Sequence, residues 1–74
     1  MTKLPVIKSK DLEKVLLDLG FSKIRQKGSH AFYRHMDGKY TTIPHHPSRD
    51  LSPILLAKIL KEIQLERDEF IRLL

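Results

Sequence analysis

The spacing of apolar residues changes twice along this chain of 74 residues, and this change constrains the fold most strongly. Near the N-terminus, apolar residues recur at the helical spacing i, i+3, i+4 and i+7, at Leu12, Val15, Leu16 and Leu19. Residues 22–44 instead alternate with the period of two that is typical of strands. A second helical stripe follows, at Leu56, Ile59, Leu60 and Ile63. The chain therefore predicts a helix, a set of strands and a second helix.

Residues that favour helix ends lie at the ends of the two apolar stripes. Ser9 is suited to cap a first helix that we expect to run to about Leu19, and Gly20 favours the left-handed conformation that ends a helix. Ser52-Pro53 suits the start of the second helix, because proline is tolerated best at the first helical position. The tail from residue 67 to 74 predicts a short additional helical segment.

Three short strands account for the alternating segment, over residues 23–26, 29–36 and 39–43. Lys27-Gly28 forms the first turn, and Asp37-Gly38 is a strong signal for a hairpin with a type I′ turn. Pro44 has no amide hydrogen for pairing and ends the third strand, and a loop at Pro47 leads to the last helix.

Two amphipathic helices that flank a three-stranded meander have one economical packing, with both stripes on one face of the sheet and the other face open. We therefore predict the α+β class, with the double-stranded-RNA-binding-domain-like order α-β-β-β-α. The sheet is antiparallel, and a single domain spans residues 1–74.

The alternation of the middle strand decides which side chains reach the open face. Ala31 and Tyr33 share one face of this strand, and the opposite face carries His30, Phe32 and Arg34. We favour the register that puts the small Ala31 beneath the helices, because the reverse would bury a histidine and an arginine.

The charge of the chain favours a polyanionic partner such as nucleic acid. There are 14 Lys and Arg against 9 Asp and Glu, a formal net charge of +5. A charged surface that only aids solubility is the alternative. The distribution favours the first interpretation, because the strand region holds a run of bases with no acid between them: Lys23, Arg25, Lys27 and Arg34.

Several classes of protein are not expected. The chain has no cysteine and no pair of histidines at the i, i+4 spacing of a helical zinc site, so we expect no metal and no cofactor. No apolar run approaches the roughly 18 residues that span a bilayer, and residues 1–5 lack the core of a secretory signal. We expect a cytoplasmic protein with no membrane partner. The acids of the first helix (Asp11, Glu13 and Asp18) are expected on its exposed side.

His30 is the candidate catalytic residue. Imidazole has an ordinary pKa of about 6.5 and exchanges protons near neutrality. Gly28 permits close approach of a ligand, and Ser29 offers a hydroxyl to a phosphate oxygen. Such a histidine can act on RNA without a metal, as general base on a ribose 2′-hydroxyl or as general acid on the 5′-oxygen. The alternative is a surface histidine with no task.

Other basic residues support this candidate. Arg25, Lys27 and Arg34 are expected to contact phosphate and to stabilise charge that develops on it. His45 and His46 follow the third strand, and either can be a second proton-transfer group or a phosphate contact. A merely polar loop is the alternative for this pair.

A series of short motifs extends this interpretation between Ser9 and Phe70. They are Gly20-Phe21, Arg25-Gln26-Lys27-Gly28-Ser29-His30, Arg34-His35 with Asp37-Gly38, Thr42-Ile43-Pro44-His45-His46, and Lys58-Ile59-Leu60-Lys61. Together they resemble the HicA (YcfA-like) toxin family.

The resemblance implies a small ribonuclease toxin of a type II toxin–antitoxin system, which cleaves mRNA. It also implies a HicB-type antitoxin that covers the active site in a toxin–antitoxin hetero-oligomer. The family's catalytic histidine, in Gly-Ser-His, falls on His30, and its Pro-x-His histidine falls on His46. A non-catalytic RNA-binding module and a degenerate toxin kept as an antitoxin partner are the alternatives.

The chain departs from the family at the start of the last helix. The family commonly has Gly-Thr-Leu-Arg there, whereas this chain has Ile54-Leu55-Leu56-Ala57. An arginine that would contact RNA is therefore missing, although Lys58 remains. Our hypothesis is that Ile54 and Leu55 enlarge a surface that faces the antitoxin.

Overall fold

The structure is a computed structural model that describes residues 3–46 and 49–74, so the predicted loop at Pro47 lies outside the described residues. Its elements are α1 (Ser9–Asp18), β1 (Ser22–Lys27), β2 (His30–Arg34), β3 (Tyr40–Pro44), α2 (Pro53–Glu62) and α3 (Arg67–Leu73). The strands form one antiparallel sheet in the order β1-β2-β3. The predicted α-β-β-β-α order and the helical tail are confirmed.

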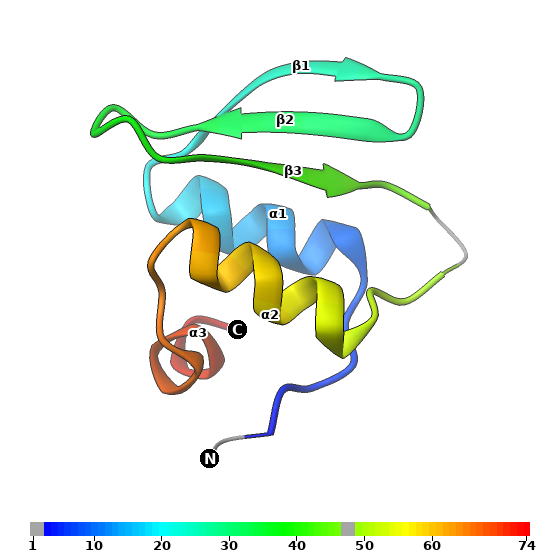
Figure 1. Cartoon of the computed structure of the whole chain (residues 1–74), viewed down its shortest axis with the longest axis vertical. Coiled ribbons are helices and arrows are strands. Elements are labelled where there is room, and N and C mark those ends of the chain that lie inside the picture. The colour runs from blue at the N-terminus through cyan, green and yellow to red at the C-terminus, as the bar shows by residue number, and fades with distance from the viewer. Residues whose placement is uncertain (1–2, 47–48) are drawn as a thin grey trace.

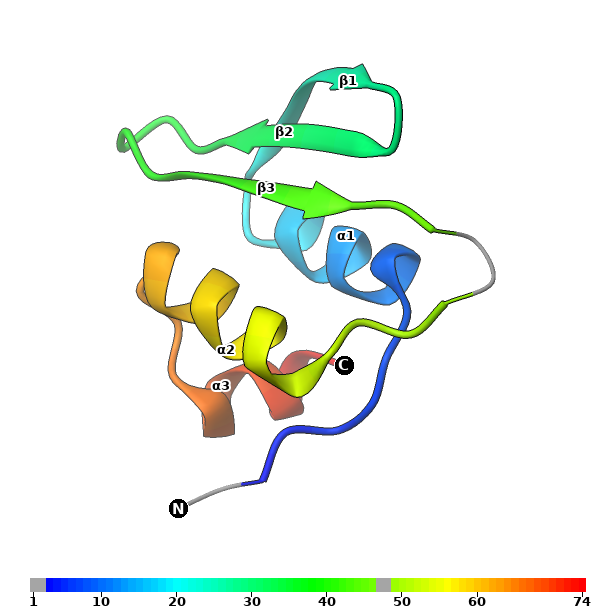
Figure 2. The same cartoon turned by 45° about the vertical axis from the view of Figure 1, so that its right-hand side comes forward.

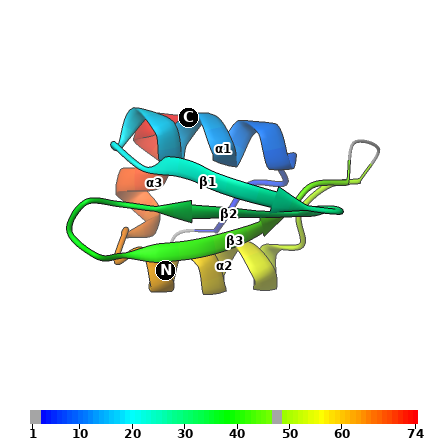
Figure 3. The ribbon, with the colours of Figure 1, turned by 90° about the horizontal axis from the view of Figure 1, so that it is seen from above.

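The molecule has two layers (Figure 1). The sheet forms one layer, and the helices form the other on a single face of the sheet. Seen from above, α1 runs along the β1 side and α2 along the β3 side (Figure 3). The far face of the sheet has no element over it within the described part of the chain. In the same part, no helix is long and apolar enough to cross a membrane.

The start of α1 differs from the prediction. Lys8, not Ser9, is the N-cap residue, and its backbone amide donates to the Asp11 carboxylate at 3.0 Å. The Ser9 hydroxyl instead donates to the carbonyl of Pro44 at 2.6 Å. The predicted cap is wrong because this hydroxyl joins α1 to the end of β3. The other end of α1 is as predicted, since Gly20 has a φ of 95°.

The two turns of the sheet are different from each other. The β1–β2 loop is Gly28-Ser29, one residue later than predicted, because Lys27 still pairs with His30. Only Gly28 has a positive φ in this loop, 59°, as the first position of a type II′ turn requires.

The β2–β3 hairpin forms where predicted, but its predicted type I′ turn is wrong. The His35 amide donates to the Lys39 carbonyl at 2.8 Å, so the loop has three residues, 36–38. Gly38 alone adopts a positive φ, 100°. Asp37 stays outside the left-handed region, and its carboxylate accepts the Lys39 amide at 2.9 Å. A turn followed by one left-handed glycine is a common hairpin of this length.

The core lies between the sheet and the helices and confirms the favoured register. Ala31 and Tyr33 of β2 are both 0% exposed, as are Leu56 of α2 and Phe70 of α3. His30 and Arg34 are exposed on the opposite face of β2. The alternation of β2 therefore sends its polar side chains away from the helices.

Two residues of α2 test this arrangement of the core. Leu56 is 0% exposed, whereas Ile54 is 85% exposed. Replacing either residue by Ala changes helix propensity little. We expect Leu56→Ala to lower the free energy of unfolding by about 2–5 kcal/mol. Ile54→Ala, the matched control, should lower it by less than about 0.5 kcal/mol. Urea denaturation measures both values, and equal losses would contradict the packing described for α2.

Candidate functional site on the open face of the sheet

His30 begins β2, the central strand, directly after the Gly28-Ser29 loop. It pairs with Lys27 of β1 on one side and with Pro44 of β3 on the other. Its side chain is exposed, and no residue in 3–46 or 49–74 forms a hydrogen bond or ion pair with its ring. The imidazole is therefore free to meet a ligand from the open side.

A β-bulge in β1 places the basic residues of this strand on different faces of the sheet. The register shifts between Lys23 and Arg25, which leaves Ile24 without a partner. Lys23 pairs with Tyr33 and faces the helices, where its Nζ lies 3.4 Å from the Glu13 carboxylate. Without the bulge, strict alternation would put Lys23 on the same face as Arg25.

After the bulge, the basic residues of β1 share the face of His30. Arg25 pairs with Phe32, and Lys27 pairs with His30 itself. Arg34 shares this face at the far end of β2, about 13 Å from His30 at ~3.3 Å per residue. Arg25 and Lys27 are therefore the cations nearest His30 on these two strands, and Arg34 lies further along the same face.

Aromatic side chains lie beside these cations. The rings of Phe32 and Tyr40 are stacked, with centroids 5.7 Å apart and an interplanar angle of 27°. Tyr40 is 61% exposed. We call the group formed by Arg25, Lys27, His30, Phe32, Arg34, Tyr40 and Thr42 the open face. It combines cations with flat rings and contains no carboxylate.

The remaining predicted site residues lie at the His30 end of the sheet. Gly28 and Ser29 form the loop that precedes His30. His46 is exposed and lies two residues beyond β3. A hollow of about 380 Å³ is lined by His46 with Lys8, Ser9, Lys10 and His45. His46 thus belongs to a basic hollow at the start of α1 rather than to the open face.

A polar cluster that we had not predicted lies on the other side of the sheet. The Tyr33 hydroxyl donates to the Glu13 carboxylate, and His45 Nε2 lies 2.9 Å from the same hydroxyl. The prediction that Glu13 belongs to the solvated side of α1 is wrong, since its side chain is only 26% exposed. Asp11 and Asp18 are exposed as predicted. The sequence feature that could have indicated this cluster is Tyr33, because a buried tyrosine hydroxyl needs a hydrogen-bond partner.

The protonation states of this cluster follow from its contacts. Burial, followed by the hydrogen bond to Glu13, raises the pKa of Tyr33 well above its ordinary value. The same hydrogen bond lowers the pKa of Glu13. Burial lowers the pKa of His45 below 6.5. At neutral pH the cluster therefore consists of a carboxylate, a neutral phenol and a neutral imidazole.

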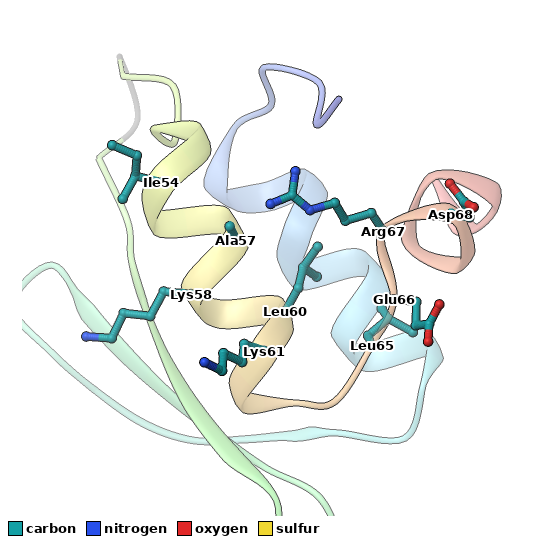
Figure 4. Close-up of a pocket in the computed structure, with 9 residues that line it drawn as sticks. All are labelled: Ile54, Ala57, Lys58, Leu60, Lys61, Leu65, Glu66, Arg67 and Asp68. Atoms are coloured by element: carbon teal, nitrogen blue, oxygen red, sulfur yellow. The ribbon is translucent and has the colours of Figure 1, made fainter. Parts of the chain in front are cut away.

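Another hollow lies between α2 and α3 (Figure 4). It has a volume of about 740 Å³, and Lys58, Lys61 and Asp68 are among the residues that line it. Ile54 lies at this hollow, whereas Leu55 is half-buried and packs against the core. No histidine lines this hollow, so it offers no group of the kind that His30 supplies on the open face.

No metal-binding cluster of three or more His, Cys, Asp or Glu side chains occurs among the residues that the structure describes. The expectation of chemistry without a metal stays a prediction.

Comparison with known proteins identifies the family. A family model described as the HicA toxin of bacterial toxin–antitoxin systems matches residues 9–65. The match covers α1, the whole sheet with its open face, and α2, and it ends before α3. No curated protein matches the chain. On the strength of this match, which covers most of the 74 residues, the chain belongs to the HicA family of toxins of bacterial toxin–antitoxin systems.

Proposed function

We propose that this toxin is a metal-independent endoribonuclease that cleaves mRNA on the open face, with His30 as the proton-transfer residue. The observation that carries the proposal is the exposed His30 ring, which has no partner among the described residues and shares its face with Lys27 and Arg25. The family supports the same activity.

The proposed chemistry needs only the RNA and side chains. A base removes the proton of a ribose 2′-hydroxyl, and the 2′-oxygen attacks the adjacent phosphorus. The bond from phosphorus to the 5′-oxygen breaks, and that oxygen takes a proton from an acid. The products are a 2′,3′-cyclic phosphate and a 5′-hydroxyl. His30 performs one of the two proton transfers, and Lys27 and Arg25 stabilise the extra negative charge on the phosphorane.

Binding of the substrate is assigned to the rest of the open face. Phe32 and Tyr40 present rings on which unpaired bases can stack. Arg34 lies far enough along β2 to contact a different phosphate from the one cleaved. Gly28 lets the RNA backbone approach closely, and the Ser29 hydroxyl is a further phosphate contact. His46, in the hollow at the start of α1, is the candidate for the second proton transfer or for a flanking phosphate.

We also propose that a HicB-type antitoxin neutralises the toxin by covering the open face, within a toxin–antitoxin hetero-oligomer. Family membership supports such a pairing. The physical support is the open face itself, which exposes aromatic and cationic side chains together and is not covered by any described element.

The first test removes the imidazole. We expect His30→Ala to lower the rate of RNA cleavage by at least about 100-fold, the usual contribution of a general acid or base. RNA affinity should change little, because the cations remain. Gel assays with a labelled RNA measure both, with EDTA added to exclude a metal and mass spectrometry to identify the cyclic phosphate.

The controls separate the competing functions. A substrate with a 2′-deoxy sugar at the cleavage site should bind and stay intact. Wild-type protein that binds RNA without cleaving it would establish the RNA-binding module instead. Cleavage by His30→Ala at the wild-type rate would show that another residue transfers the proton.

The second test compares two exposed lysines, Lys27 on the open face and Lys14 on α1. We expect Lys27→Gln to weaken RNA binding and to reduce the slope of log affinity against log salt by about 0.7, the value for one contact with a single strand. Lys14→Gln removes the same charge and should leave the slope unchanged. Fluorescence anisotropy at several salt concentrations measures this. Equal effects of the two variants would mean that net charge, not the open face, binds RNA.

A further inference from the structure

The polar cluster of Glu13, Tyr33 and His45 lies on the helix side of the sheet, and His45 directly follows Pro44, the β3 partner of His30. Tyr33 stands three residues after His30 on β2 and points to the opposite face, where it is 0% exposed. Its hydroxyl has partners on two other segments, Glu13 on α1 and His45 after β3. Figure 2 shows α1 passing beneath the sheet.

The chemistry of the three groups fixes the orientation of the His45 ring. A tyrosine hydroxyl has one hydrogen, and the Tyr33 hydroxyl donates it to the Glu13 carboxylate, which can only accept. His45 Nε2, 2.9 Å from the hydroxyl, must then be the donor in the second bond. The neutral imidazole therefore carries its hydrogen on Nε2. One tautomer and one ring orientation satisfy this chain of bonds.

The backbone of His45 connects this cluster to the segment that leads into β2, the strand that begins with His30. The His45 amide donates to the carbonyl of Ser29, the residue before His30, at 2.5 Å. The preceding residue, Pro44, pairs with His30, and its carbonyl accepts the Ser9 hydroxyl at 2.6 Å. Pro44, at the end of β3, and His45, directly after it, are therefore both held by hydrogen bonds from the helix side of the sheet.

The hydrogen bonds that hold Pro44 and the His45 ring both lead back to one face of α1. Ser9 and Glu13 are four residues apart, so they project from the same side of the helix. Ser9 holds Pro44 directly, and Glu13 holds His45 through Tyr33. The segment that pairs with His30 and supports its loop is thus anchored to α1 at two points.

We propose that Glu13, Tyr33 and His45 are positioning residues that hold the Ser29-His30 backbone in the geometry needed for RNA cleavage. None of them touches the substrate, because Tyr33 and Glu13 lie under the sheet and His45 acts through its main chain. The proposal rests on the proposed ribonuclease function, and it assigns to His45 a role distinct from that of His46.

Tyr33→Phe is the first variant, since it removes only the hydroxyl and keeps the buried ring. We expect kcat to fall about 10-fold with KM nearly unchanged, within the ~100-fold that a displacement of about 1 Å can cost. His45→Phe keeps an aromatic ring and the backbone amide but loses the Nε2 donor, and should produce a similar fall. The double variant should fall no further than either single variant, because both break the same chain of bonds.

Matched variants distinguish positioning from general stability. Glu13→Gln retains an oxygen that accepts the Tyr33 hydrogen bond and should keep most of the activity, whereas Glu13→Leu should behave like Tyr33→Phe. Thr41→Val removes another bond from the sheet to a helix, Thr41 Oγ1 to Glu62 at 2.8 Å, at the residue that pairs with Tyr33 but outside the chain of bonds from Glu13 to Ser29. It should lower the midpoint of thermal unfolding but leave kcat unchanged.

A second readout does not depend on cleavage. In NMR spectra of the folded protein, Tyr33→Phe should shift the Ser29 and His30 amide resonances and speed hydrogen exchange at His45, whereas Thr41→Val should do neither. Unchanged resonances with unchanged kcat would overturn the positioning role. Losses of kcat that add up in the double variant would also overturn it. If the wild-type protein cleaves no RNA, the ribonuclease function fails, and the NMR comparison still decides whether the cluster positions His30.

Discussion

The alternation of side chains along β2 determines which residues form the core and which reach the open face. Ala31 and Tyr33 are buried against the helices, so His30, Phe32 and Arg34 must lie on the open face. A shift of one residue would reverse every one of these positions and bury a histidine and an arginine. The burial of a small and an aromatic residue thus fixes the candidate site on the opposite surface. Core and site are two faces of the same five-residue strand.

Much of this arrangement follows from patterns that are local in the sequence. The helical stripes, the left-handed Gly20 and the alternation of β2 act over a few residues, so the element order and the face of His30 could be predicted. Other features depend on partners far along the chain. Ser9 was predicted as a cap, but Pro44 competes for its hydroxyl. The local sequence places Glu13 on the exposed side of α1, but its carboxylate accepts a hydrogen bond from Tyr33, which lies twenty residues away in sequence.

The bulge in β1 shows a different limit of sequence patterns. A run of alternating bases predicts one basic face, and nothing local indicates that the register shifts at Ile24. The shift separates two roles, because Lys23 pairs with Glu13 on the helix side of the sheet while Arg25 and Lys27 stay with His30. Family membership is consistent with the proposed use of this face, and the geometry adds which cations lie near the imidazole. Arg34 shares the face of His30 but lies at the other end of β2.

The proposed function requires that RNA binds to the open face, with His30 at its end. NMR titration of the labelled protein with an RNA strand that carries 2′-deoxy sugars, and so stays intact, tests it most directly. We expect the largest shifts at the His30 ring, Lys27 and Phe32, and no shifts at the hollow between α2 and α3. Shifts concentrated at Lys58 and Lys61, with His30 unchanged, would contradict it.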